Sequence, residues 1–181
     1  MIKSVILIGT ESTGKTALAK QLSDDFEALF VPEYARIYLE KKKELGLITA
    51  ENMISKEDVA PIAIGQLNLE TTFLSLQREL LFFDTSILMT LIYSRYYFNY
   101  SPKWLEDSVS SNKQNQLVLF LQPDIPFKDD PQRGSVDDRL KIHFLIQKEL
   151  QTRNMEAVTI QGADEIRTEK ARREVRKWLL K

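Results

Sequence analysis

The segment from residue 9 to residue 16 combines glycines, a lysine and a threonine at a spacing that suits phosphate binding. It reads Gly9-Thr10-Glu11-Ser12-Thr13-Gly14-Lys15-Thr16 and fits the pattern Gly-x-x-x-x-Gly-Lys-Ser/Thr. In this pattern the backbone amides converge on phosphate oxygens, the lysine adds a positive charge, and the threonine hydroxyl ligates Mg²⁺. The expected ligands are therefore ATP and Mg²⁺, with Thr16 on the metal. The residues expected to hold the nucleotide are Gly9, Glu11, Ser12, Thr13, Gly14, Lys15 and Thr16.

The residues on either side of this loop favour a phosphate site over an ordinary glycine turn. Residues 5–8 form a short apolar run rich in β-branched side chains, which predicts a buried strand of a parallel sheet. Leu18, Leu22 and Phe26 recur at every fourth position and predict a helix from residue 15 to residue 25. A helix that begins at the loop adds its positive N-terminal end to the phosphate site.

Two acidic residues follow predicted strands. Glu33 comes after residues 28–31, and Asp84 comes after residues 80–83. The carboxyl ends of parallel strands face the ligand crevice, so both acids are candidates for chemistry. Glu33 is expected to accept the proton of a substrate hydroxyl, and Asp84 to hold Mg²⁺ through a water or through Thr16. The alternatives are an acid in the first turn of a helix for Glu33 and a helix cap for Asp84.

A third candidate region is the proline-punctuated stretch from about residue 123 to residue 138. It contains Asp124, which is expected to contact the substrate, and Arg133, and the helix that follows carries Arg139 near its start. Arginine presents a forked donor that matches phosphate oxygens. The stretch is therefore predicted to be a lid that closes over ATP and excludes water. The alternative is a solvated surface loop.

Strand and helix patterns alternate along the chain. This alternation predicts an α/β P-loop NTPase fold, a three-layer sandwich of about five parallel strands with helices on both faces and a small lid. A single domain over residues 1–181 is expected. In the last helix, Ile166, Val175, Trp178 and Leu179 are expected to face inward. The other predicted helices cover 33–46, 55–78, 85–98, 101–105, 138–153 and 164–180, and the other strands cover 117–121 and 157–160.

Composition restricts the kind of partner. The chain has 25 lysines and arginines against 26 acidic residues, for a net charge of −1, so no nucleic-acid partner is expected. The absence of cysteine excludes disulfides, thiolate metal sites and cysteine nucleophiles. Apolar runs stay well below the roughly 20 residues of a membrane span, so a cytoplasmic protein without a membrane partner is expected. The single histidine, His143, and the tyrosine-rich stretch 93–100 are expected mainly to pack, although one of these tyrosines is a candidate for the substrate pocket.

Several segments together resemble the ribosylnicotinamide kinase domain of NadR-type proteins. They are the loop at residues 9–16, Pro32-Glu33-Tyr34-Ala35-Arg36, Phe83-Asp84-Thr85, the stretch 126–133 and the loop 162–167. That domain has a Glu-Tyr-x-Arg stretch after its second strand, an Asp-Thr after its third strand, and a Pro-Trp-x-x-Asp-Gly-x-Arg lid. The sequence departs from the lid pattern at Phe127 and Pro131. The resemblance covers essentially the whole chain.

The resemblance implies a kinase that transfers the ATP γ-phosphoryl group to the 5′-hydroxyl of nicotinamide riboside. It implies that Glu33, Tyr34 and Arg36 face the nucleoside and that Asp84 faces the metal or the hydroxyl. Arg133 and Arg139 would face the phosphates, and Gly162 would lie in the nucleotide site. The sequence leaves open whether Glu33 or Asp84 is the general base, and it does not indicate an oligomeric state.

Two other functions are considered. One is a different nucleoside kinase or a nucleoside monophosphate kinase, in which Arg36 and Arg95 would hold the monophosphate. The other is a regulatory P-loop ATPase without a small-molecule acceptor; the guanine-reading Asn-Lys-x-Asp motif of GTPase switches is absent from the sequence.

Overall fold

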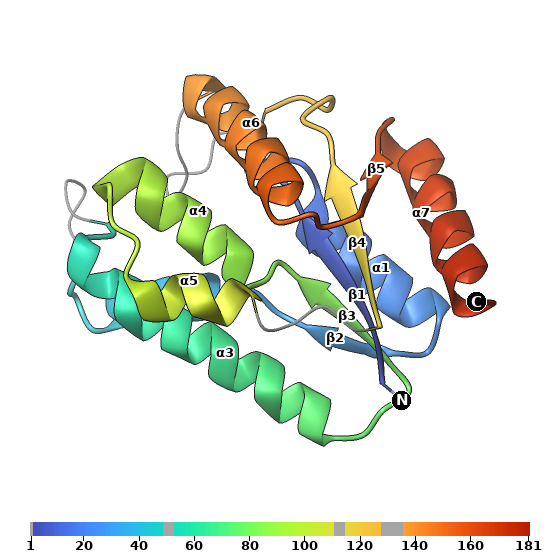
Figure 1. Ribbon diagram of the computed structural model, residues 1–181, viewed down its shortest axis with the longest axis horizontal. Coiled ribbons are helices and arrows are strands. Elements are labelled where there is room, and N and C mark those ends of the chain that lie inside the picture. The colour runs from blue at the N-terminus through green and yellow to red at the C-terminus, as the bar shows by residue number, and fades with distance from the viewer. Residues whose placement is uncertain (1, 49–52, 111–114, 128–135) are drawn as a thin grey trace.

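The computed structural model describes residues 2–48, 53–110, 115–127 and 136–181 (Figure 1). The described residues form a five-stranded parallel sheet in the order β2-β3-β1-β4-β5. The strands are β1 (Lys3–Ile8), β2 (Leu29–Val31), β3 (Leu80–Asp84), β4 (Gln116–Leu121) and β5 (Ala157–Ile160). The helices are α1 (Lys15–Asp25), α2 (Tyr34–Glu44), the short 3-10 helix η1 (Lys56–Asp58), α3 (Val59–Ser75), α4 (Ile87–Phe98), α5 (Lys103–Ser110), α6 (Val136–Thr152) and α7 (Asp164–Leu179).

The sheet is the middle of three layers, as the sequence predicts. Side chains alternate along β1, so that Val5 and Leu7 face one core while Ile6 and Ile8 face the other. Helices α1 and α7 cover the first face, and α3, α4, α5 and α6 cover the second (Figure 1). Because both faces are buried, β1 is apolar on both sides, which explains its continuous apolar run.

The strand order places the candidate acids beside the phosphate loop. Strand β1 pairs with β3 on one side and β4 on the other, and β2 lies beyond β3. In this register Leu7 lies opposite Asp84, two residues before the loop begins, and Val31 lies opposite Phe83. The segments after β1, β2 and β3 therefore emerge at the same edge of the sheet, where doubly wound folds bind ligands.

Helix α2 is held to the start of α3 by a buried acid. The Asp58 carboxylate accepts hydrogen bonds from Lys42 Nζ at 2.8 Å, the Tyr38 hydroxyl at 2.7 Å and the Ser55 amide at 2.8 Å. Burial opposes ionisation of Asp58, but the bonds from Lys42, Ser55 and Tyr38 outweigh it and lower the pKa of Asp58 to about 2. This contact fixes the segment that carries Glu33.

The structure corrects several element boundaries. Helix α4 begins at Ile87 rather than at Thr85, because Thr85 has a φ of +82°, which is not helical. Helix α5 runs on to Ser110, since Val109 continues its buried face. Helix α3 ends at Ser75, before the predicted end at residue 78.

One inward-facing residue of the last helix is also corrected. Ile166 is 73% exposed, because the buried stripe of α7 follows Arg167, Ala171 and Val175 at every fourth position. Val175 is fully buried as predicted, while Trp178 and Leu179 are partly buried against the same core. Within the part of the chain that the structure describes, no helix is long and apolar enough to cross a membrane.

Candidate active site

The phosphate loop joins β1 to the first turn of α1. Gly14 adopts a φ of +79°, a left-handed conformation that glycine tolerates without strain, and this turn starts the helix at Lys15. The Thr13 hydroxyl donates to the Thr10 carbonyl at 2.7 Å, and Lys15 Nζ donates to the same oxygen at 2.9 Å. The Thr10 carbonyl therefore ties the lysine ammonium and the Thr13 hydroxyl to the start of the loop.

Thr16 and Asp84 meet across the crevice. The Thr16 hydroxyl donates to Asp84 Oδ2 at 2.6 Å. Asp84 is buried, and its Oδ1 has no hydrogen-bond partner among the described residues. Two oxygen donors with a spare carboxylate lone pair fit Mg²⁺, which takes few protein ligands and completes its shell with water and phosphate. No cluster of three or more His, Cys, Asp or Glu residues capable of holding a metal is found in the described ranges.

The backbone next to Asp84 is strained. Thr85 has a φ of +82°, which a β-branched residue seldom adopts, and its amide donates to the Leu7 carbonyl at 3.0 Å. The Thr85 hydroxyl is buried and has no hydrogen-bond partner among the described residues. Such strain is typical of functional sites, where the surrounding structure holds an unfavourable conformation.

Glu33 follows β2 and occupies the N-cap position of α2, but its side chain does not cap the helix. It has extended backbone angles before α2, and its side chain makes no capping hydrogen bond. Burial raises the pKa of Glu33, and the negative charges of Asp84 and Glu11 add to the effect. The positive charges of Lys15 and Arg36 oppose it. A carboxyl group with a raised pKa among other acids and a lysine is suited to accept a proton.

Three tyrosines of α4 lie beside the acid of the phosphate loop, in a group that we call the tyrosine wall (Tyr93, Tyr96, Tyr97 and Glu11). The rings of Tyr93 and Tyr97 stack with centroids 6.2 Å apart, and Tyr96 meets Tyr97 edge-on at 4.9 Å. Burial and the negative charges of Glu11 and Glu33 raise the pKa of Tyr93 well above its usual value, and Tyr93 hydrogen-bonds to Glu11. The tyrosine wall therefore combines aromatic rings with negative charge.

The sequence did not indicate that Glu11 lies beside these tyrosines. Besides Tyr93, Glu11 Oε2 accepts a hydrogen bond from the Thr10 hydroxyl at 2.6 Å, and Glu11 is buried. The loop and α4 are far apart in the chain, so only the fold brings them together. Tyr96 is also bonded to Asp138 at the start of α6. The sequence offered only an acidic residue inside the glycine-lysine loop and, far along the chain, a run of tyrosines.

Tyr34 and Arg36 begin α2 beside Glu33. The Tyr34 ring lies against Gly65 of α3, where an added Cβ would come within 1.9 Å of the ring. Arg36 is an electrostatic neighbour of Glu33, and its Nε is buried without a hydrogen-bond partner among the described residues. By contrast, Arg95 is committed to ion pairs with Glu149 and Glu106. Arg95 is therefore not free to hold a substrate monophosphate.

A buried arginine of α6 bonds to the backbone of the phosphate loop. Arg139 donates through Nη2 to the carbonyl oxygens of Ser12 and Ile125, each at 3.0 Å. Its guanidinium lies over the Phe127 ring, 5.8 Å from the centroid. Arg139 thus lies at the phosphate loop, where its observed hydrogen bonds go to backbone carbonyls; its predicted role toward the phosphates stays a prediction. Arg133 and about half of the predicted lid fall at residues 128–135, outside the described residues.

A second buried arginine, Arg167 of α7, also bonds to the backbone of the phosphate loop. Arg167 bonds to the Thr13 carbonyl, to the Gly162 carbonyl at 2.6 Å, and to Asp124 in an ion pair. The other oxygen of Asp124 accepts the Gly162 amide at 2.7 Å. Asp124 and Gly162 are therefore joined to each other and to the phosphate loop. An arginine within the buried stripe of α7 was the sequence signal for this residue, which was not among the expected site residues.

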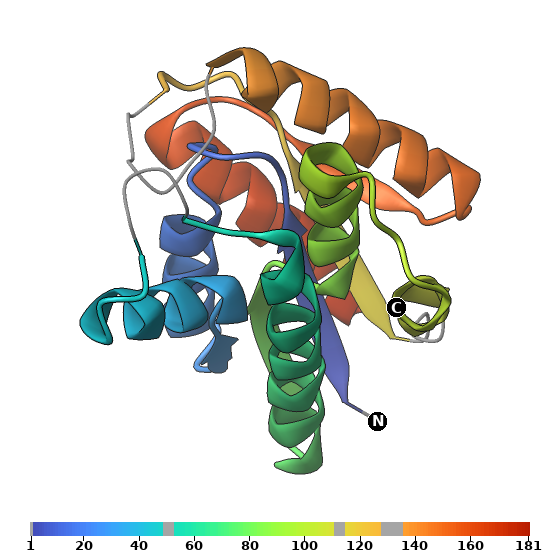
Figure 2. The same ribbon diagram turned by 90° about the vertical axis from the view of Figure 1, so that its left-hand side faces the viewer.

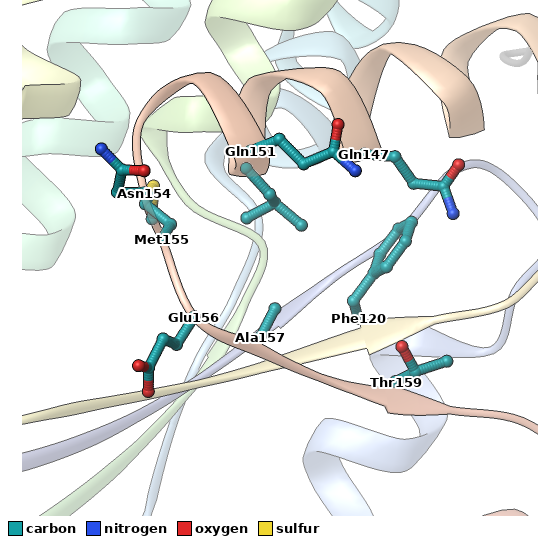
Figure 3. A pocket seen from close by; sticks show the side chains of 9 residues that line it. Phe120, Gln147, Gln151, Asn154, Met155, Glu156, Ala157 and Thr159 are labelled. Carbon is teal, nitrogen blue, oxygen red and sulfur yellow. The ribbon is translucent and has the colours of Figure 1, made fainter.

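A separate hollow of about 580 Å³ lies between α6 and β5 (Figure 3). Phe120 of β4 and Thr159 of β5 form one side, and Gln147 and Gln151 of α6 form the other. His143 stacks on Phe120 at 4.9 Å, which confirms its packing role. Because β5 and β2 lie at opposite edges of the sheet, this hollow is separate from Glu33.

The sequence and the fold were compared with known proteins. The family described as "AAA domain" matches residues 4–167. The chain belongs to this family. Two curated relatives are the trifunctional NAD biosynthesis/regulator proteins NadR of Salmonella typhimurium (strain LT2) and Escherichia coli (strain K12), 26% and 25% identical over 165 residues. These matches cover 90% of this chain and 39% of each relative, so the chain spans well under half their length.

Solved structures share the fold. A NadR protein in complex with NR has a TM-score of 0.81 at 21% identity, covering 98% of this chain and 50% of that one. A NadR protein in complex with NAD and AMP-PNP has a TM-score of 0.78, covering 98% and 49%. Thymidylate kinase from Ehrlichia chaffeensis has a TM-score of 0.64 at 13% identity, and the match covers 98% of each chain. The α/β P-loop fold and the resemblance to NadR-type proteins are thereby confirmed.

Proposed function

We propose that this protein is an ATP-dependent kinase that phosphorylates the 5′-hydroxyl of nicotinamide riboside and yields nicotinamide mononucleotide. The observation that carries the proposal is the tyrosine wall beside Glu33. The nicotinamide ring of the riboside is a cation, and a cation is attracted both by aromatic faces and by nearby carboxylates. A neutral base would gain much less from the charge of Glu11.

Each residue around the phosphate loop would have its own role in this reaction. Thr16 and Asp84 would hold Mg²⁺, which neutralises phosphate charge when bound. Lys15 sits at the N-terminus of α1 and would exchange its bond to Thr10 for one to the phosphates. Electrostatic stabilisation of this kind, together with the alignment of donor and acceptor, supplies most of the catalysis in phosphoryl transfer.

The proton of the acceptor hydroxyl needs a base. The 5′-oxygen forms a bond to the γ-phosphorus, the bond from that phosphorus to the β–γ bridging oxygen breaks, and ADP leaves. We assign the base to Glu33, because Asp84 Oδ2 is already engaged by the Thr16 hydroxyl while burial raises the pKa of Glu33. Glu33 takes the hydroxyl proton as the new bond forms.

The test is a steady-state assay of ADP formation with ATP, Mg²⁺ and a panel of acceptors. The panel contains nicotinamide riboside, nicotinic acid riboside, cytidine, thymidine and thymidine monophosphate. Nicotinamide riboside should give the highest kcat/KM, and nicotinic acid riboside should be weaker because its carboxylate faces Glu11. Glu11→Gln should narrow that difference. If none of these acceptors raises ADP formation above background, the proposed function is wrong.

A nucleoside monophosphate kinase is the second candidate, and one observation favours it. The buried Nε of Arg36 is without a partner among the described residues and offers a donor to an anionic group. Arg36→Ala should then weaken the binding of thymidine monophosphate far more than the binding of thymidine. A similar effect of Arg36→Ala on both acceptors would remove this candidate.

A further inference from the structure

Two polar residues of α3 lie inside the core, between the segments that carry the candidate acids. Gln66 is 2% exposed and Glu70 is 7% exposed, and both continue the buried stripe of Val59, Ile62 and Ala63. Burying an amide and a carboxyl group in this way costs stability unless they form hydrogen bonds, so their partners indicate what they do.

The hydrogen bonds form a continuous chain. The Tyr34 amide donates to Gln66 Oε1 at 3.0 Å, and Gln66 Nε2 donates to Glu70 Oε1 at 2.8 Å. The same Glu70 oxygen accepts the Ile87 amide at 3.2 Å. Tyr34 follows Glu33 directly, and Ile87 comes three residues after Asp84. A single side-chain pair therefore connects the segment of one acid to the segment of the other.

These bonds satisfy backbone amides at the N-termini of two helices. Tyr34 and Ile87 are the first residues of α2 and α4, where the backbone amides lack partners within the helix. The preceding residues, Glu33 and Ser86, provide no side-chain cap. Helix α3 supplies the missing acceptors instead, and the carboxyl of Glu70 lies at the positive end of α4. Glu33 is thereby left free of a capping role.

We propose that Gln66 and Glu70 are positioning residues that fix Glu33 and Asp84 relative to each other through the amides of Tyr34 and Ile87. The inference rests on the proposed function for its kinetic consequence. A displacement of about 1 Å at a reacting group reduces catalysis by roughly 100-fold. Loss of this link should therefore slow phosphoryl transfer, although neither side chain touches the substrate.

The kinetic test compares Gln66→Leu, Glu70→Leu and Glu70→Gln in the full chain with the best acceptor. The two leucine variants should lower kcat by about 10- to 100-fold while the Kd for ATP stays within about twofold, because the phosphate loop is held by other residues. Glu70→Gln keeps an acceptor oxygen in place and should restore kcat to near the wild-type value. If Glu70→Gln is as impaired as Glu70→Leu, a hydrogen-bonded link is not what Glu70 provides.

A matched control separates positioning from general loss of stability. Ser94→Ala removes another hydrogen bond of a buried side chain, from the Ser94 hydroxyl to the Tyr100 carbonyl at 2.6 Å, which does not reach either acid segment. It should lower Tm but leave kcat unchanged. If the leucine variants lower only Tm, as is expected of Ser94→Ala, the residues are structural and the proposal is overturned.

A second readout does not depend on activity. Amide hydrogen exchange should accelerate at both Tyr34 and Ile87 in Glu70→Leu, although Glu70 contacts only the second amide. Unchanged exchange at Tyr34 in this variant would overturn the link. If the wild-type protein phosphorylates no acceptor but the two amides respond together, the proposed function fails while the link stands.

Discussion

Gly65 of α3 makes room for the Tyr34 ring, and a methyl group at this position should displace it. A Cβ at Gly65 would lie 1.9 Å from Tyr34 Cε1, 2.2 Å from Cζ and 2.4 Å from Cδ1. Carbon atoms prefer separations of about 3.5 Å, so the ring must move by roughly 1.5 Å. Gly65→Ala, a change within α3, should therefore displace the segment that carries Glu33 and Tyr34.

Two opposing effects set the stability of this variant. Overpacking of this kind costs about 1–3 kcal/mol. Replacing glycine by alanine inside a helix stabilises by about 1 kcal/mol. Gly65→Ala should consequently be between neutral and about 2 kcal/mol less stable than the wild type. In a Tyr34→Ala background the clash is gone, so the same change should stabilise by about 1 kcal/mol.

The assay is urea denaturation of the four proteins of this double-mutant cycle, together with steady-state kinetics. The coupling between Gly65 and Tyr34 should be about 1–3 kcal/mol. Gly65→Ala should lower kcat/KM for the acceptor by up to about 100-fold with little change in ATP affinity. If Gly65→Ala stabilises the wild-type background by the same amount as the Tyr34→Ala background, the ring does not lie against α3 and the reasoning is refuted.

Four further variants test the site and its support. Lys15→Ala should abolish ATP turnover in an ADP-release assay; turnover at the wild-type rate would remove Lys15 from the phosphate site. Glu33→Gln should lower kcat by roughly 10²–10⁴-fold with ATP binding retained. Because the folded pKa of Glu33 is raised, the stability of the wild type falls as pH rises from about 4.5 through that pKa. Glu33→Gln should therefore be more stable than the wild type in a denaturation experiment at pH 8. Asp84→Asn should raise the Mg²⁺ concentration for half-maximal activity at least about tenfold in a metal titration; an unchanged titration would contradict a metal role. Asp58 has a folded pKa lowered from 3.8 to about 2, so it stabilises above pH 4 and this contribution is lost as pH falls toward 2. Asp58→Asn should therefore cost roughly 2 kcal/mol at pH 7, with a difference from the wild type that narrows in acid; a constant difference would contradict this.

Sequence reasoning found the acids but could not decide between their roles. The end of an apolar run marks the end of a strand, and the ends of parallel strands share one edge, so Glu33 and Asp84 were expected near the loop. The different roles that we propose for them follow from contacts: Asp84 meets the Thr16 hydroxyl, while the partly buried Glu33 lies among other charges. A one-dimensional pattern does not contain those distances.

The arginines illustrate the same limit. Arg95 was a candidate for a substrate phosphate, but the fold pairs it with Glu106 and Glu149. Arg167 was not a candidate, yet it joins Thr13 to the loop after β5. An arginine has the same forked donor wherever it occurs, and only its neighbours decide whether it binds a ligand or the backbone.

The sequence by itself determined the phosphate loop, the parallel sheet and the acids at its edge. These features depend on spacing along the chain: eight consecutive residues form the loop, and apolar runs define the strands. The tertiary structure alone decided that Glu11 joins the tyrosines of α4 and that Gln66 and Glu70 link the two acid segments. Those features depend on side chains from separate elements meeting at hydrogen-bond distance, which packing sets and local sequence does not encode.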